Sequence, residues 1–224
     1  GNRFVIRLRG VTDEAELEQR LDMIRQGVPN YFGEQRFGHH YGNLTKGAAL
    51  IAGKLKERQR HKKGLYISAV RSFLFNQQVS GRIQQQLFSQ CMTGDVLMLN
   101  GSQSCFIYDA SDASIEPRLA GADIHLTASM WGRGRSICSD DAFAWEQQQL
   151  SGYDELLQGL ERLGLNQERR AIRLMPENLV AVKEADDQFQ LSFDLQVGSF
   201  ATSVLRELCN VVAPSRDQST GGES

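Results

Sequence analysis

Alternating apolar and polar residues predict β-strands at both ends of the chain. Phe4, Ile6 and Leu8 share one face of a strand over residues 3–9, and arginines occupy most of the other face. Residues 179–182 and 189–197 form a predicted hairpin, whose second strand places an apolar residue at every other position. Because neither end segment can bury its apolar face alone, we expect the two to pair in one sheet.

Helical spacing predicts a helix beside each of these strand segments. The first helix begins at Thr12 or Asp13, which favour the N-cap, and ends at Gly27. Near the other end of the chain, Gly198 and Ser199 open a second helix, with Ser199 as its N-cap. The apolar positions that the two helices turn inward are Leu17, Leu21 and Ile24, and Ala201, Val204, Leu205 and Leu208.

The middle of the chain is predicted to be mostly helical. Residues 43–88 have helical spacing, with breaks at Gly53 and Gly64, and residues 150–163 form another helix. The remaining segments are two short strands over residues 95–100 and 105–108, an irregular region over residues 110–145, and a helix that begins at Asn166 and runs through Ile172.

These elements predict an α+β protein. Residues 1–27 and 175–213 form the predicted sheet domain, and residues 28–174 form a largely helical α/β insertion between its two halves. The polar residues 214–224 are expected to be a disordered tail.

Composition narrows the class of protein. A content of 41% hydrophobic and 23% charged residues is typical of a globular protein. No apolar run reaches the roughly 18 residues of a membrane-spanning helix. The four cysteines and four histidines show no zinc-ligand spacing, so we expect reduced thiols, a cytoplasmic location, no metal and no cofactor.

Positive charge is gathered locally. The net charge of −2 gives no overall attraction to nucleic acid. Residues 54–63, the basic segment, contain six Lys or Arg against one Glu, a local charge of +5. This segment is either a solvated face or a surface that follows RNA phosphates. Its cationic residues are Lys54, Lys56, Arg58, Arg60, Lys62 and Lys63.

Residues 27–38 have a composition that an ordinary helix, strand or loop would not use. They read Gly-Val-Pro-Asn-Tyr-Phe-Gly-Glu-Gln-Arg-Phe-Gly, with three glycines and three aromatic residues. One interpretation is a packed loop whose rings fill the core. The segment, called the signature loop below, also resembles the P-N-Y-F-G-x-Q-R-F-G signature of the TruD family of tRNA pseudouridine synthases.

Three further blocks are similar to motifs of that family. Residues 2–4 resemble its G-N-x-F motif, residues 71–77 resemble its R-S-x-L-F-N-Q helix, and residues 198–207 resemble its G-S-F-A-T-x-x-x-R-E motif. The resemblance implies a pseudouridine synthase-type sheet domain of mixed or antiparallel strands, here partial, interrupted by the family's TRUD insertion domain.

The resemblance implies that uridine, at position 13 of tRNA, is isomerised to pseudouridine. The reaction breaks the N1–C1′ bond, turns the uracil and rejoins it through C5, which requires a base flipped out of its stack. The family places the counterparts of Asn2 and Phe4 at the uridine pocket, and stacking on an aromatic ring contributes about 1–3 kcal/mol. Phe4 and Phe200 are therefore candidates for the stacking platform, Asn2 for reading the uracil edge, and Arg36 for RNA binding. The alternatives are plain packing roles: an inward strand residue for Phe4, and a residue packed at a helix start for Phe200.

One family motif is missing from these residues. The nucleophilic aspartate of the family lies in K-D-x-x-A-x-T-x-Q, N-terminal to G-N-x-F, and the sequence does not contain this motif. Asp22 lies in a segment similar to the G-R-L-D motif of other pseudouridine synthase families, but a carboxylate on a helix surface is the simpler interpretation.

We therefore expect the chain to be the C-terminal two-thirds of such an enzyme and to be inactive alone. It would supply a wall of the uridine pocket and an RNA-docking insertion, and its partners would be tRNA and the missing N-terminal part. The alternative is a non-catalytic RNA-binding fragment that lacks the half bearing the aspartate.

Overall fold

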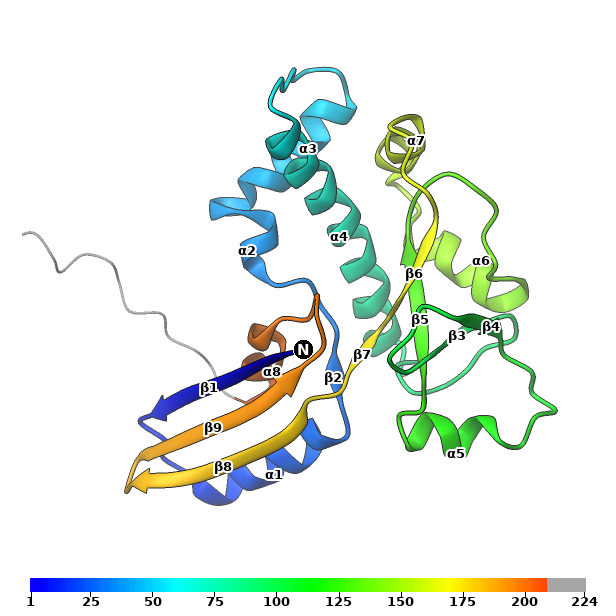
Figure 1. Cartoon of the computed structure of the whole chain (residues 1–224). Helices are drawn as coiled ribbons and strands as arrows, with labels where there is room; N and C mark the ends of the chain where they lie inside the picture. Colours follow the sequence, from blue (N-terminus) through cyan, green and yellow to red (C-terminus); the bar gives the residue numbers. More distant parts are fainter. Residues whose placement is uncertain (209–224) are drawn as a thin grey trace, which may run out of the picture.

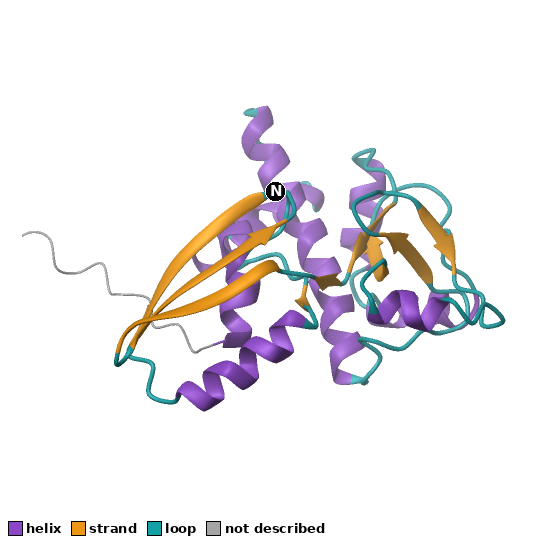
Figure 2. Cartoon of the chain, turned by 60° about the horizontal axis from the view of Figure 1, so that its bottom comes forward, coloured by secondary structure: helices purple, strands orange, loops and turns teal. Residues whose placement is uncertain are grey.

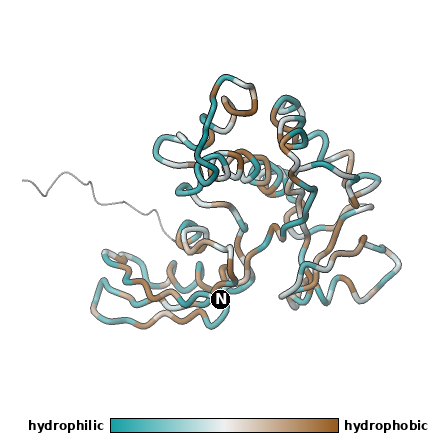
Figure 3. The backbone as a smooth tube through the Cα atoms, turned by 45° about the horizontal axis from the view of Figure 1, so that its top comes forward, coloured by the Kyte–Doolittle hydropathy of each residue, from teal (hydrophilic) through white to brown (hydrophobic). Residues whose placement is uncertain are grey.

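The computed structural model describes residues 1–208, with two larger antiparallel sheets on either side of a long helix (Figure 1). The first sheet has three strands in the order β1 (Asn2–Arg9), β9 (Gln188–Leu195) and β8 (Glu177–Ala185). The predicted pairing of the two ends is confirmed, because β1 runs antiparallel to β9 with Phe4 opposite Phe193. The tube of these strands alternates between apolar and polar colours in Figure 3.

Two helices cover the apolar face of the three-stranded sheet. They are α1 (Glu14–Arg25) and α8 (Ala201–Leu208), as the spacing predicted. Asp13 caps α1 by accepting a hydrogen bond from the backbone N–H of Glu16 at 2.9 Å. The core between sheet and helices includes the fully buried Leu21 of α1 and Val204 of α8. Burial of these side chains stabilises the sheet by about 1.5–3 kcal/mol each.

The helical part begins with three short elements and continues into the long helix. After α2 (Glu34–Phe37) and a 3-10 turn (His39–Tyr41), α3 (Gly42–Ile51) packs against α4 (Arg60–Gln84). The two helices approach so closely that a Cβ at Gly47 would lie 2.4 Å from the carbonyl oxygen of Tyr66.

The predicted break between these helices at Gly53 is confirmed, with φ of +73° at that residue. The predicted break at Gly64 is wrong, because α4 runs through this position. One interior glycine costs a helix only about 1 kcal/mol, which a helix of 25 residues packed on both α3 and a sheet can absorb.

The second sheet has four antiparallel strands in the order β4 (Cys105–Ile107), β3 (Val96–Leu99), β5 (Ile124–Met130) and β6 (Glu168–Ala171). Three helices flank it: α5 (Ile115–Ala120), α6 (Asp140–Gln149) and α7 (Asp154–Arg162). Figure 2 shows these shorter strands on the opposite side of the molecule from the three long ones. The predicted strands over residues 95–100 and 105–108 are confirmed.

Two predictions in this region are wrong. The region 110–145 is not irregular, because it contains α5, β5 and the start of α6. Residues 166–172 are not a helix, because β6 pairs with β5 over Thr127–Met130. The predicted helix at residues 150–163 is shorter than expected and begins at Asp154.

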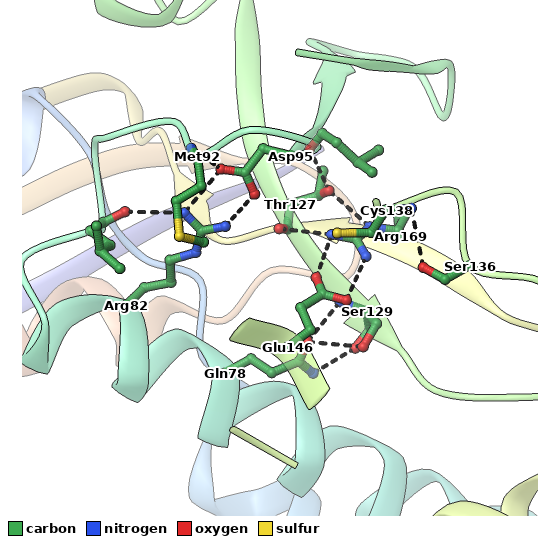
Figure 4. A network of polar contacts seen from close by, with 12 residues as sticks. Gln78, Arg82, Met92, Asp95, Thr127, Ser129, Ser136, Cys138, Glu146 and Arg169 are labelled. Atoms are coloured by element: carbon green, nitrogen blue, oxygen red, sulfur yellow. Dashed lines mark hydrogen bonds and ion pairs between the residues drawn. The ribbon is translucent and has the colours of Figure 1, made fainter. Parts of the chain in front are cut away.

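Buried polar side chains explain both errors. Thr127 and Ser129 lie on a face of β5 that is buried, and Ser129 is hydrogen-bonded to Gln78 of α4 at 2.9 Å (Figure 4). Arg169 of β6 is also buried and forms an ion pair with Glu146 at 2.7 Å. A strand buried on both faces with polar residues on one of them lacks the apolar run by which such strands are recognised.

A second buried ion pair lies in the same network. Arg82 of α4 binds Asp95, and both side chains are almost fully buried (Figure 4). Buried charges remain in a protein core when they are paired and hydrogen-bonded, and Asp95 also accepts from the backbone N–H of Met92 at 2.7 Å. The charges in the core of this region are therefore compensated.

The two connections between the sheets run side by side. β2 (Val28–Pro29) pairs antiparallel with β7 (Arg173–Leu174), with Val28 opposite Leu174. The predicted insertion boundaries at residues 28 and 174 coincide with this pair. The division into domains itself stays a prediction.

Within residues 1–208, no helix combines the length and apolar character needed to cross a membrane. Cys91, Cys105 and Cys138 are free thiols. The predicted tail over residues 214–224, and the end of the sheet domain beyond Leu208, lie outside the described residues.

Candidate functional site

The signature loop is held by the helix that carries the R-S-x-L-F-N-Q block. Asn76 of α4 accepts a hydrogen bond from the backbone N–H of Phe32 at 2.9 Å and donates one to the carbonyl oxygen of Phe32 at 3.0 Å. One amide side chain therefore satisfies both backbone groups of a residue that is only 8% exposed.

The next contact joins the signature loop to the start of α8. The hydroxyl of Ser203 donates to the carbonyl oxygen of Tyr31 at 3.0 Å. A Cβ at Gly33 would lie 2.7 Å from the Oγ1 atom of Thr202, so this glycine permits the close approach of loop and helix. The ring of Phe200 lies 6.0 Å from that of Phe32.

A third set of contacts joins the loop to β6. Asn30 binds the carbonyl oxygen of Ala171 through its side chain and that of Ile172 through its backbone N–H, each at 2.8 Å. Its Oδ1 accepts from Arg170 at 2.8 Å, and the same guanidinium donates to the carbonyl oxygen of Gly198 at 3.1 Å. Three of the four sequence blocks therefore meet at one place, with Arg170 between two of them.

A cavity of about 640 Å³ opens at this meeting point. Phe32 and Arg170 line one side, Leu195 and Ser199 line the side near the first sheet, and residues 98–103 of the second sheet line another. The side chain of Gln196 donates a hydrogen bond to that of Asn100 at 3.1 Å, which joins the two sides of the cavity. The cavity thus lies between the two sheets and is bounded by both.

Positive charge surrounds the aromatic rings of the loop. The guanidinium carbon of Arg170 lies 4.3 Å from the centre of the Phe32 ring, and that of Arg36 lies 5.6 Å from it. Arg206 lies 5.9 Å from the centre of the Tyr31 ring. Burial, and then the nearby charge of Arg36, lower the pKa of Arg170 to about 10. Arg170 still carries its charge at neutral pH.

The structure places Phe4 and Phe200, two of the predicted uridine-binding residues, in different core clusters. Phe4 stacks on Phe193 at 5.5 Å and packs with the core of the first sheet. Phe200 packs with Phe32 in the other core cluster. Asn2 is exposed at the start of β1. Among the described residues that line the cavity are Gly1 and Ser199, the neighbours of Asn2 and Phe200, but not those residues themselves. Their role in uridine binding stays a prediction.

The basic segment lies elsewhere, on the connection between α3 and α4 and in the first turn of α4. Lys54, Lys56, Arg58, Arg60 and Lys62 are exposed, and Lys63 is half-buried. This arrangement fits either interpretation of the segment, a solvated face or an RNA-binding surface. The distant Asp22 is exposed and forms an ion pair with Arg25 at 2.5 Å, which accounts for its presence on the helix surface.

Sequence reasoning missed Arg170, Asn30 and Asn76 as the residues that connect the blocks. Asn30 and Asn76 belong to the sequence blocks, so the resemblance already included them. No pattern in the sequence indicated that Asn30 contacts β6 or that Asn76 contacts Phe32. Arg170 follows Arg169 directly, and both line the cavity, but Arg169 is paired with Glu146 whereas the side chain of Arg170 points to the other side of the strand.

Comparison with known proteins agrees with the four blocks. The model of the tRNA pseudouridine synthase D (TruD) family matches residues 1–61 and 55–208. The chain is 47% identical over 209 residues to tRNA pseudouridine synthase D of Aeromonas salmonicida, covering 93% of this chain and 59% of that protein. The corresponding protein of Hydrogenovibrio crunogenus is 44% identical over 213 residues, covering 94% of this chain and 61% of that one.

A solved structure shares the fold. The crystal structure of a protein named as a candidate tRNA pseudouridine synthase D from Methanosarcina mazei superimposes with a TM-score of 0.71 at 20% sequence identity. The match covers 93% of this chain and 68% of that chain. The chain spans less than two thirds of the length of the two bacterial relatives.

Proposed function

The chain belongs to the tRNA pseudouridine synthase D (TruD) family, and from this membership we propose that it supplies one wall of the uridine pocket and the RNA-docking insertion of a tRNA-modifying isomerase. Residues 1–27 and 175–213 would form part of the catalytic sheet domain, and residues 28–174 the TRUD insertion. The substrate would be tRNA, with the target at position 13, and a tRNA substrate implies a cytoplasmic location.

The observation that carries this proposal is the meeting of three sequence blocks beside one cavity, which residues of two of these blocks line. The signature loop, the helix of residues 71–77 and the segment of residues 198–207 are distant in sequence, and Asn76, Ser203 and Arg170 join them through hydrogen bonds. A purely structural role would not require the rings of this loop to lie beside an open cavity and beside arginines that form no ion pair within the described residues.

The chemistry requires a group that we propose to come from another part of the enzyme. Pseudouridylation needs a carboxylate that attacks the ribose or the base, or that moves a proton. The family's aspartate motif is not among these 224 residues. The contribution of this chain would be to bind tRNA, to hold the flipped base by stacking on Phe4 or Phe200, and to read its edge with Asn2.

Release of tritium from tRNA that carries 5-tritiated uridine tests the catalytic part of the proposal. We expect no release by this chain alone, and release when a second polypeptide carrying the K-D-x-x-A-x-T-x-Q segment of a relative is added. Turnover by the chain alone would show that the nucleophile lies within it.

Tritium release together with filter binding separates the two candidate functions, part of an isomerase or a non-catalytic RNA-binding fragment. If the mixture binds tRNA, as measured by filter binding, but releases no tritium, the chain is the RNA-binding fragment that we consider as the alternative. If the chain does not bind tRNA at all, both candidate functions fail.

A further inference from the structure

We propose that Arg36 and Arg170 together form an anion site that binds one phosphodiester group of the RNA backbone beside the cavity. The inference rests on the proposed function for the identity of the ligand. The two arginines come from different elements, α2 and β6, and both lie over the ring of Phe32. The proposed site therefore consists of two cations that lie beside the same aromatic ring, and not of a single surface residue.

The charges of this pair are not compensated. Within residues 1–208, no ion pair joins either arginine to a carboxylate, whereas the adjacent Arg169 is paired with Glu146 and the buried Arg82 with Asp95. Like charges that lie close together in a partly buried place destabilise the protein, because water screens them poorly. The fold thus neutralises the two arginines that are almost fully buried, Arg82 and Arg169, and leaves Arg36 and Arg170 positive.

The hydrogen-bonding groups of the pair are also incomplete. The Nε atoms of Arg36 and Arg170 are buried and have no hydrogen-bond partner among residues 1–208. Arg36 donates from Nη1 to the hydroxyl of Ser68 at 3.1 Å, and Arg170 donates from Nη2 to Asn30 and Gly198. A bound anion would accept from Nη2 of Arg36 and Nη1 of Arg170, the atoms that these hydrogen bonds do not use, and would remove the repulsion between the two guanidinium groups.

A phosphodiester matches this site better than a carboxylate of a peptide. Both anions carry one negative charge and two free oxygens, which the planar guanidinium group binds as a fork, so the surroundings of the site decide between them. The rings of Phe32 and Phe200 lie within 6.0 Å of Arg36, and aromatic rings beside arginines are the usual surface for unstacked nucleotides. The cavity next to Arg170 has room for the nucleotide attached to that phosphate.

Titration of the full chain with dimethyl phosphate tests the pair without RNA. Arginine Nε–Hε resonances in a ¹⁵N–¹H spectrum report the two unpartnered donors directly. We expect saturable shifts of the Arg36 and Arg170 resonances, and loss of the Arg170 shift in the R36Q variant. R118Q is the control, because Arg118 is already paired with Asp123 at 2.6 Å, and it should leave both shifts unchanged.

An absence of saturable shifts, or an Arg170 response that R36Q leaves intact, would overturn the proposal. R36Q carries the test because, within residues 1–208, the side chain of Arg36 makes one hydrogen bond, to Ser68, whereas replacing Arg170 also removes contacts that hold the signature loop.

The salt dependence of tRNA binding gives the second test. R36Q should reduce the slope of log K against log salt concentration by about 0.7–0.9, the value for one phosphate contact. R36K should restore most of the slope because it keeps the charge. An unchanged slope in R36Q would show that no phosphate is bound there. If the unaltered chain does not bind tRNA, the proposed function fails, and the dimethyl phosphate titration still decides whether the anion site exists.

Discussion

Replacement of Asn76 by alanine should destabilise the signature loop and, with it, the whole fold. Asn76 makes two hydrogen bonds to the backbone of Phe32, and alanine leaves one N–H and one C=O group without a partner. Each such group costs about 1–3 kcal/mol when buried. The Phe32–Asn76 contact is partly buried, so water replaces some of the loss, and we expect a decrease of about 2 kcal/mol in the free energy of unfolding.

Urea unfolding monitored by circular dichroism measures this change. A loss of about 2 kcal/mol raises the unfolded fraction roughly 30-fold, because each 1.4 kcal/mol is a factor of ten. It lowers the urea midpoint by about 1 M if the slope is about 2 kcal/mol per M. The matched control is Gln77→Ala, at the next position of α4. It also removes an amide, but the Gln77 side chain makes no hydrogen bond within the described part of the chain.

A third variant separates the two bonds. Asn76→Asp retains an acceptor for the N–H of Phe32 but places a carboxylate against its carbonyl oxygen, so its stability should lie below the Gln77→Ala control. If the free energies of unfolding of Asn76→Ala and Gln77→Ala differ by less than about 0.5 kcal/mol, the two hydrogen bonds of Asn76 do not stabilise the fold as we expect.

Three further predictions concern the buried pair, one histidine and the basic segment. Glu146→Gln leaves Arg169 buried without its partner and should cost about 3–5 kcal/mol in urea unfolding; a loss below 1 kcal/mol would contradict this. Burial lowers the pKa of His125 to about 4, so the unfolded chain binds a proton on this residue at a higher pH than the folded chain does. The free energy of unfolding should therefore keep its full value above pH 6.5 and fall as the pH decreases toward 4. His125→Asn should flatten that part of the curve. Replacing Lys62 and Lys63 together by Glu should weaken tRNA binding and flatten its salt dependence; an unchanged slope would remove the basic segment from the interface.

The sheet built from both ends of the chain could be predicted from the sequence because its signals are local and consistent. Phe4, Ile6 and Leu8 alternate on β1, and their partners alternate on β9, so each strand alone reports which face is buried. The capping side chain of Asp13 and the glycine after α1 fix the helix ends in the same way.

The four-stranded sheet could not be predicted in full because its central strands conceal polar residues. His125 and Thr127 on β5 are buried, and each is hydrogen-bonded to a partner from a different element: Nε2 of the histidine to the side chain of Asn100, and the threonine hydroxyl to the carbonyl oxygen of Val96. Such partners are known only once the chain is folded. Residues 168–171 likewise form a strand because β5 provides the ladder, and no periodicity within four residues could show this.

The site could be predicted as a set of blocks but not as an arrangement. The resemblance identified the signature loop and the segment that contains Phe200, and the structure shows that they touch. It also shows Phe4 and Phe200 in different core clusters, so their shared role in a uridine pocket stays a prediction.

Photo-crosslinking of the proposed target base is the most direct test of whether this chain lines the uridine pocket. tRNA with 5-bromouridine at position 13 would be irradiated in complex with this chain, and the crosslinked peptides would be mapped by mass spectrometry. We expect crosslinks within residues 2–4, 27–38 or 198–204, around the cavity that Phe32 and Arg170 line. Crosslinks confined to the basic segment, or to the far side of the four-stranded sheet, would contradict it.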